Sequence, residues 1–203
     1  MICIARPGYG ASSPYRLANI AEWADVVAVV VDQLGLSQFD LLGMSSGAPY
    51  TYSIAHHFPQ RVRNVYIFSG IPALCDETIL RHWPYPVNKN ANIAELEKLA
   101  HDLFFTDLSE EDLKQNAAKD SMMNNCFGIA QDLRLRCRGW GFDLSEVNAR
   151  VYMQHSRWDT GVPLVTAELT ARLLPNCSLE VTDTDVHFSE AALDEFIRSV
   201  ILG

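Results

Sequence analysis

Short apolar runs alternate with amphipathic stretches along most of this chain. Apolar runs bounded by turn residues predict buried strands at residues 2–5, 39–44, 65–69, 151–155 and 179–182. Apolar side chains at helical spacing predict helices at residues 20–34, 48–57, 164–174 and 190–202. Strands that alternate with helices indicate a mostly parallel, doubly wound sheet with helices on both faces. The predicted fold class is therefore α/β.

The alternation stops between residues 71 and 148, where the sequence carries helical patterns but no clear strand. One apolar stripe at helical spacing consists of Leu96, Leu99, Leu103 and Phe104. Further along, Ser109 and Asp112 have the spacing of a capping box at the start of another helix. We therefore predict that residues 71–148 form a helical lid, inserted into a core made of residues 1–70 and 149–203.

Composition and charge limit the classes of molecule that the protein is expected to bind. With 203 residues, 48% of them hydrophobic, the chain is long enough for one domain with its own core and a modest insertion. Its formal net charge of −9 disfavours nucleic acid and anionic membrane as partners, because both bind basic surfaces. We expect a small-molecule substrate and neither a nucleic-acid nor a membrane partner.

Cysteine usage and the start of the chain indicate a compartment. The five cysteines make an odd number, and no two of them have the spacing of a metal site or a redox pair. The apolar start at residues 1–5 is short and ends at Arg6-Pro7-Gly8, so it lacks the features of an export signal. No apolar run is long enough to span a bilayer. The expected protein is cytoplasmic, with reduced cysteines.

A G-x-S-x-G motif, from Gly43 to Gly47, lies between the predicted strand 39–44 and the predicted helix 48–57. That context makes it a candidate nucleophile elbow, a sharp turn that projects the Ser45 hydroxyl above the sheet. The flanking glycines let the backbone turn without a Cβ clash. The next helix directs its positive end at the site, so the backbone N–H of Ser46 is a candidate oxyanion donor. Ser46 is also the rival nucleophile, one residue off the pattern.

A serine hydroxyl needs a base, and His187 is the candidate among six histidines. It lies between the last predicted strand and the last predicted helix, where this kind of fold places its base. Asp159, in the segment after the predicted strand 151–155, is the candidate acid that orients the imidazole. The chain order is then Ser, Asp, His. Asp183 and Asp185 are closer to His187 in sequence, and Asp185 is the better of these two alternatives.

These residues give the chain a resemblance to the α/β-hydrolase superfamily, and within it to lidded bacterial esterases and peptidase-like members. The resemblance is carried by the loop after the family's fourth strand, the nucleophile elbow, the link to the sixth strand, and the acid and histidine loops. In this sequence these segments are residues 6–12, 41–47, 58–62, 159–163 and His187. Residues 132–134 and 140–143 are similar to the stretch where the family's lid rejoins the core. The likeness covers nearly the whole chain and is poorest in the lid.

The sequence departs from the family at its front. Family members have three strands and a His-Gly loop before the counterpart of residues 2–5, and that loop supplies the first oxyanion N–H. They also place one strand between the counterparts of residues 2–5 and 39–44. Three explanations stay open: the sequence is a fragment, the gap is filled by residues 2–5 or by a second chain, or the protein has abandoned catalysis. An open sheet edge favours a homodimer.

The resemblance and the residues together predict a serine hydrolase that acts on a small ester or amide through an acyl-enzyme, without a metal ion or an organic cofactor. Its triad would consist of Ser45, His187 and Asp159. The predicted substrate-binding side chains are Met44, Trp83, Phe104, Phe127 and Trp158. A serine at the elbow disfavours epoxide hydrolases and haloalkane dehalogenases, which use an aspartate there. Two alternatives stay open: a catalytically impaired α/β-hydrolase-like binding protein, and an acyltransferase.

Overall fold

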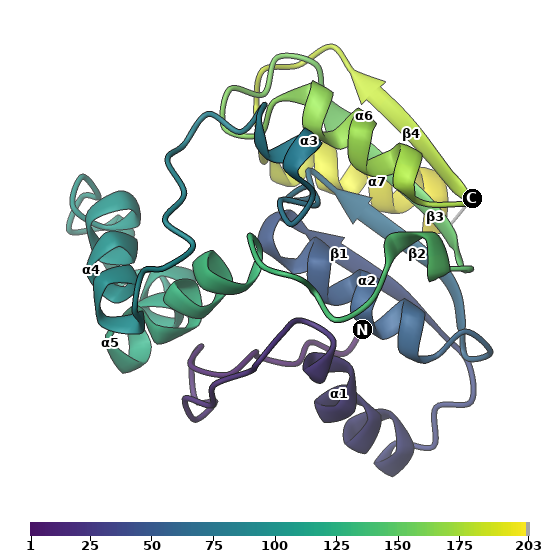
Figure 1. Ribbon diagram of the computed structural model, residues 1–203, viewed down its shortest axis with the longest axis horizontal. Coiled ribbons are helices and arrows are strands. Elements are labelled where there is room, and N and C mark those ends of the chain that lie inside the picture. The colour runs from purple at the N-terminus through teal and green to yellow at the C-terminus, as the bar shows by residue number, and fades with distance from the viewer. Residues whose placement is uncertain (202–203) are drawn as a thin grey trace. The chain divides into compact units, whose positions relative to one another are not determined.

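A computed structural model describes residues 1–201, and the chain divides into two compact units. The sheet unit is formed by Asn19–Pro86 together with the chain from Gly139 onwards. The helical unit is formed by Met1–Ala18 and Val87–Arg138. Figure 1 shows the elements of both units, coloured along the chain.

The sheet unit contains one sheet of four parallel strands in the order β1-β2-β3-β4. The strands are β1 (Phe39–Met44), β2 (Val62–Phe68), β3 (Arg150–Ser156) and β4 (Cys177–Thr182). Parallel neighbours cannot be joined by a tight turn, so each connection crosses over through helical segments. Because all strands run the same way, their carboxyl ends lie at one edge of the sheet. The sheet confirms the predicted α/β class.

Helices cover both faces of this sheet. The helices and 3₁₀ turns of the sheet unit are α1 (Glu22–Gln33), η1 (Ser45–Gly47), α2 (Ala48–His57), α3 (Glu77–Leu80), η3 (Leu144–Glu146), α6 (Leu164–Leu173) and α7 (Glu190–Ile201). Tyr66 and Tyr152 pack with Phe196 of α7 on one face. Met153, the next residue of β3, faces the other way and contacts the Tyr52 hydroxyl of α2. Figure 1 accordingly shows α7 on the opposite side of the sheet from α2 and α6.

The helical unit consists mainly of two helices that pack around one apolar cluster. Its elements are α4 (Ile93–Phe104), η2 (Asp112–Lys114) and α5 (Asn116–Leu135). Of the predicted apolar stripe on α4, Leu96 joins the cluster, whereas the other three side chains are exposed. The predicted capping pair is present before η2, since the Asp112 N–H donates to Ser109 Oγ at 3.1 Å and the Ser109 N–H to Asp112 Oδ2 at 3.3 Å.

The N-terminal segment belongs to the helical unit. Residues 1–6 have no regular secondary structure, so the predicted strand at 2–5 is wrong. Apolar residues form a strand only where a neighbouring strand satisfies their backbone groups, and Ile2 is instead 56% exposed. Arg6 Nη2 and the Tyr9 hydroxyl both donate to Asp132 Oδ2 of α5, at 2.5 and 2.7 Å. These bonds attach the segment to α5.

The division into units also differs from the predicted boundaries. The helical unit includes residues 1–18, which the prediction assigned to the core, and leaves out residues 71–86 and 139–148, which it assigned to the lid. The other predicted strands and helices are present, with ends shifted by a few residues. Leu202, the last residue of the predicted C-terminal helix, lies outside the described residues. Within residues 1–201, no helix has the length and apolar character needed to cross a membrane.

Candidate active site

The Ser45 turn connects β1 to α2 through η1. Ser45 has a φ of 44°, in the left-handed region that residues other than glycine rarely adopt. Its carbonyl oxygen accepts a hydrogen bond from the Ile71 N–H at 2.9 Å, which helps to hold this strained backbone in place. A sharp, strained turn between a strand and a helix is the backbone geometry of a nucleophile elbow.

The two glycines of the motif lie in different surroundings. A Cβ on Gly43 would meet Thr51 Oγ1 at 2.5 Å and Ile67 Cδ1 at 3.0 Å, so only glycine fits there. A Cβ on Gly47 would meet no described neighbouring atom within 4 Å, and its φ of −76° suits any residue. The prediction that both glycines avoid a Cβ clash is therefore right for Gly43 and wrong for Gly47.

Three side chains from distant parts of the sheet unit form a continuous hydrogen-bonded chain. His187 Nε2 lies 2.9 Å from Ser45 Oγ, and His187 Nδ1 lies 2.6 Å from Asp159 Oδ2. Ser45 follows β1, His187 follows β4 and Asp159 follows β3, so their loops emerge at the same edge of the parallel sheet. The alternative acid, Asp185, is exposed, and the carboxylate that contacts His187 is that of Asp159.

Asp159 is buried and tightly bonded. The residue is 5% exposed, and its Oδ1 accepts the backbone N–H groups of Gly161 and Val162 at 2.8 and 2.9 Å. Burial alone would raise the pKa of Asp159, but the hydrogen bonds from His187 and Val162 outweigh it, and the pKa lies below its ordinary value. The ionised carboxylate holds the proton on His187 Nδ1, which leaves Nε2 as an acceptor toward Ser45.

A second histidine, His155 at the end of β3, supports the acid loop from the inside. Its side chain is fully buried, and its Nε2 lies 2.7 Å from the carbonyl oxygen of Val162. A carbonyl only accepts, so Nε2 carries the proton. Burial lowers the pKa of His155, and it outweighs the bond to Val162 and the charge of Asp159, which act in the other direction. His155 is therefore a neutral donor that fixes the loop around Asp159.

The candidate oxyanion donor, Ser46, follows Ser45 within η1, the turn that leads into α2. The first N–H groups of a helical segment have no acceptor within it and carry its positive end. Ser46 therefore lies at the positive end of the segment that leads into α2, and its role as an oxyanion donor stays a prediction.

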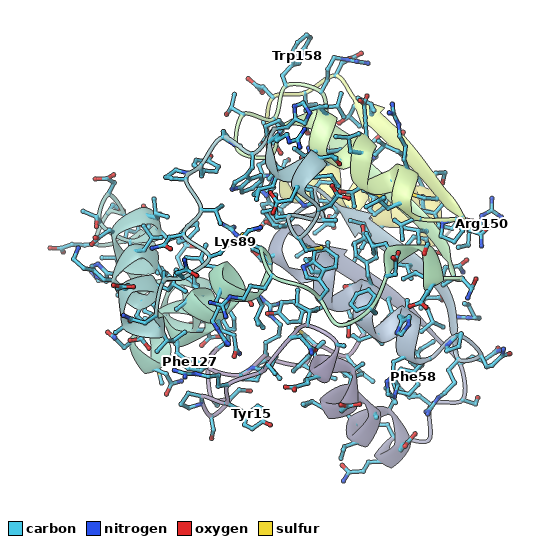
Figure 2. All side chains as sticks on the ribbon, in the orientation of Figure 1. Tyr15, Phe58, Lys89, Phe127, Arg150 and Trp158 are labelled. Carbon is cyan, nitrogen blue, oxygen red and sulfur yellow. The ribbon has the colours of Figure 1, made fainter. Side chains whose placement is uncertain are left out.

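Two of the predicted substrate-binding residues adjoin the hydrogen-bonded chain in sequence. Met44 and Trp158 precede Ser45 and Asp159, and they are 39% and 62% exposed. Figure 2 shows Trp158 at the outer end of its loop, pointing away from the protein.

The other three predicted substrate-binding residues are not neighbours in sequence of Ser45, Asp159 or His187. Trp83 is buried in the sheet unit beside Tyr85, with their ring centroids 5.4 Å apart. Phe104 and Phe127 belong to the helical unit, where Phe104 is half-exposed and Phe127 lies against the backbone of Gly8. A substrate-binding role for all five residues stays a prediction.

The sequence analysis missed two polar residues at the end of β3. His155 bonds to the acid loop, as described above, and Ser156 Oγ donates to the carbonyl oxygen of Val186 at 2.7 Å, next to His187. Both residues are buried. Their signal was in the sequence: polar residues that end an apolar parallel strand lie at the edge where such sheets place their sites.

Comparison with known proteins identifies relatives of this chain. A family profile described as the alpha/beta hydrolase fold matches residues 1–189. A hydrolase from Pseudomonas aeruginosa is 18% identical with a TM-score of 0.67, over 97% of this chain and 77% of that one. An esterase from Exiguobacterium antarcticum is 19% identical with a TM-score of 0.69, over 96% and 77%. A thermophilic esterase from Thermogutta terrifontis is 15% identical with a TM-score of 0.65, over 96% and 75%. No curated protein gives a significant match.

Proposed function

The chain belongs to the alpha/beta hydrolase fold family, and on that premise we propose that it is a cytoplasmic serine hydrolase that cleaves a small ester or amide through an acyl-enzyme. The observation that carries the proposal is the hydrogen-bonded chain from Ser45 Oγ through His187 to Asp159, with separations of 2.9 and 2.6 Å. A serine hydroxyl becomes an effective nucleophile only beside such a base. The proposed chemistry uses no metal ion and no organic cofactor.

In the acylation step, Ser45 Oγ attacks the carbonyl carbon of the substrate while His187 Nε2 takes the serine proton. The carbonyl π electrons move to the oxygen, and the Ser46 N–H is the proposed donor to that oxyanion. Asp159 stabilises the imidazolium, because its ionised carboxylate lies 2.6 Å from Nδ1. The tetrahedral intermediate then expels the alcohol or amine, which takes the proton from Nε2.

In the deacylation step, His187 Nε2 takes a proton from water, and the water oxygen attacks the acyl carbon. The second tetrahedral intermediate breaks its bond to Ser45 Oγ, which recovers the proton from Nε2. The product is a carboxylic acid. An alcohol or amine in place of water would give acyl transfer by the same steps.

A fluorophosphonate probe tests the proposed nucleophile and base. The wild type and the Ser45→Ala, His187→Ala and Ser46→Ala variants are treated with the probe, and their intact masses are recorded. We expect one adduct on Ser45 in the wild type and none in Ser45→Ala or His187→Ala. Ser46→Ala is the matched control, because it removes the rival hydroxyl and keeps the backbone N–H.

Each other outcome points to a different reading. An adduct that persists in Ser45→Ala would show that another side chain is the nucleophile. A folded wild type without any adduct would contradict the hydrolase proposal and favour a binding protein. If labelling succeeds, hydrolysis of p-nitrophenyl acetate with and without an added alcohol separates hydrolysis from acyl transfer.

A further inference from the structure

The histidine loop, residues 183–189, joins β4 to α7 without regular secondary structure. Contacts on both sides of His187 attach this loop to the sheet. On one side, the Val186 carbonyl oxygen accepts the Ser156 hydroxyl at 2.7 Å. On the other, the Phe188 ring packs edge-on against Phe68 of β2, with ring centroids 6.3 Å apart.

Among the described residues, the backbone hydrogen bonds that join this loop to the end of β3 lie at the beginning of the loop. The Arg157 N–H donates to the Thr182 carbonyl oxygen at 2.8 Å, and the Trp158 N–H donates to that of Thr184 at 2.9 Å. These bonds stop two residues short of Val186. The Ser156 hydroxyl is therefore the group that extends the connection between the two strand ends to the residue next to His187.

Ser156 is itself held by further hydroxyl groups. It is 6% exposed, and Thr184 Oγ1 donates to its Oγ at 2.7 Å. Thr182 Oγ1 lies 3.3 Å from Thr184 Oγ1. A hydroxyl has one proton, so Thr184 donates to Ser156 and Ser156 donates to Val186, while Thr182 Oγ1 also donates to the His155 carbonyl oxygen at 3.5 Å. The bonds donated by Thr184 and Ser156 both run toward the Val186 carbonyl, and bonds aligned in this way polarise and strengthen one another.

We propose that Ser156 is a positioning residue for His187, with Thr184 as its supporting donor. Ser156 acts through the Val186 backbone and does not touch the reacting atoms. The same strand end carries Asp159 three residues later, so β3 sets the spacing between the acid and the base of the hydrogen-bonded chain. This inference rests on the proposed serine hydrolase function.

The expected effect is on rate more than on substrate binding. A displacement of about 1 Å in a reacting group can lower the rate roughly 100-fold. We therefore expect Ser156→Ala to slow fluorophosphonate labelling of Ser45 by about 10- to 100-fold. The kcat for p-nitrophenyl acetate should fall similarly, with KM nearly unchanged. Thr184→Val should have a smaller effect in the same direction, because Ser156 still donates to Val186.

The experiment compares the full-length wild type with Ser156→Ala, Ser156→Thr, Thr184→Val and Ser178→Ala. Ser156→Thr keeps the hydroxyl and should restore most of the rate. Ser178→Ala is the matched control, since it removes an exposed hydroxyl from β4. Thermal unfolding checks the folded fraction. Proton NMR follows the downfield resonance of the His187 Nδ1–H bonded to Asp159, identified by its loss in His187→Ala.

Slower labelling and a weakened resonance in folded Ser156→Ala support the proposal. It is overturned if Ser156→Ala keeps the wild-type rate and resonance, or if its rate falls only in proportion to the unfolded fraction. If Ser156→Ala does not fold, the same readouts on Thr184→Val decide, because Thr184 is exposed. If the wild type is not labelled, the proposed function fails, and the resonance alone then tests the positioning role: persistence in Ser156→Ala overturns it.

Discussion

The acid loop, residues 159–163, and the histidine loop, residues 183–189, supply the two partners of one hydrogen bond, but they are held differently. The Asp159 side chain is 1% exposed, and it folds back onto two N–H groups of its own loop. His155 adds a bond from the buried side. The His187 side chain is 32% exposed, and the residues on either side of it are held by one hydroxyl, that of Ser156, and by one ring contact, that of Phe188 with Phe68.

Because the two loops are held differently, changes in them should affect the free energy of unfolding and the rate to different extents. A buried, multiply bonded loop contributes to the cooperative core, so changes there should lower both the free energy of unfolding and the rate. A half-exposed loop with few contacts opens at lower cost than the core. Changes in the histidine loop should therefore lower the rate while leaving the free energy of unfolding nearly intact.

The largest effect is expected for Asp159→Asn. The amide keeps the shape of the side chain but removes the charge that holds the His187 tautomer, so kcat/KM should fall by about 10⁴-fold. Loss of a buried charged acceptor should also lower the free energy of unfolding by about 1–3 kcal/mol. Kinetics with p-nitrophenyl acetate and urea unfolding measure the two quantities. Asp185→Asn is the matched control, and an equal loss there would contradict the choice of acid.

The next largest effect is expected for substitutions of His155, which should lower the free energy of unfolding. His155→Phe removes the buried bond to Val162 and should lower the free energy of unfolding by about 1–3 kcal/mol. His155→Gln keeps an N–H donor near the position of Nε2 and should lose less. A destabilisation no larger than that of the exposed His101→Gln would contradict the supporting role of His155.

The pH dependence of the free energy of unfolding gives a further test of the neutral, buried His155. Burial lowers the pKa of His155 in the folded protein below its ordinary value of 6.5. As pH falls below 6.5, the unfolded chain binds a proton at His155 that the folded protein does not, so stability is lost toward acid. The wild type should lose up to about 1.4 kcal/mol per pH unit more than His155→Gln in this range. Equal slopes in urea unfolding from pH 7 to 5 would contradict a neutral buried His155.

Phe188→Ala tests the histidine loop. It removes the ring contact with Phe68 next to His187. We expect fluorophosphonate labelling to slow by about 10-fold, within the range for a displaced reacting group. Because Phe188 is 47% exposed, the free energy of unfolding should fall by only about 1 kcal/mol. Phe142→Ala is the control, since its ring stacks on His56 at the far end of α2. A large loss in the free energy of unfolding without slower labelling would contradict the proposed difference between the acid loop and the histidine loop.

The strands and helices that could be predicted are those that a local pattern of apolar residues determines. The strands and crossover helices of the sheet unit each carry their own apolar pattern, so the order β1, α2, β2 and then β3, α6, β4, α7 followed from the sequence. The meeting of Ser45, Asp159 and His187 followed from topology, because parallel strands bring their carboxyl ends to one edge. Their catalytic roles are still a proposal.

The parts that were not predictable depend on contacts between distant residues. Whether residues 2–5 form a strand depends on a pairing partner, and the bond from Arg6 to Asp132 spans 126 positions. The open space at Gly47 depends on what lies beside it and not on the motif. The place of Ser156 at the end of a strand indicates the edge where it lies, but not its bond to Val186, because a strand-ending serine carries no signal of which carbonyl it will meet.

The smallest effect is expected for the ion pair between Arg157, which precedes the acid loop, and Asp183 of the histidine loop. Arg157 Nε lies 2.5 Å from Asp183 Oδ1, with side chains 43% and 78% exposed. Exposed pairs lose side-chain entropy and are screened by salt, so Asp183→Asn should change the free energy of unfolding by less than about 1 kcal/mol. Labelling of Ser45 should stay within about twofold of the wild type by the same reasoning. Asp102→Asn, which breaks the exposed pair with Lys98 on α4, gives the baseline for such a change. If Asp183→Asn slowed labelling as much as Ser156→Ala, the histidine loop would be held by surface charge, and the buried hydroxyl would not be its anchor.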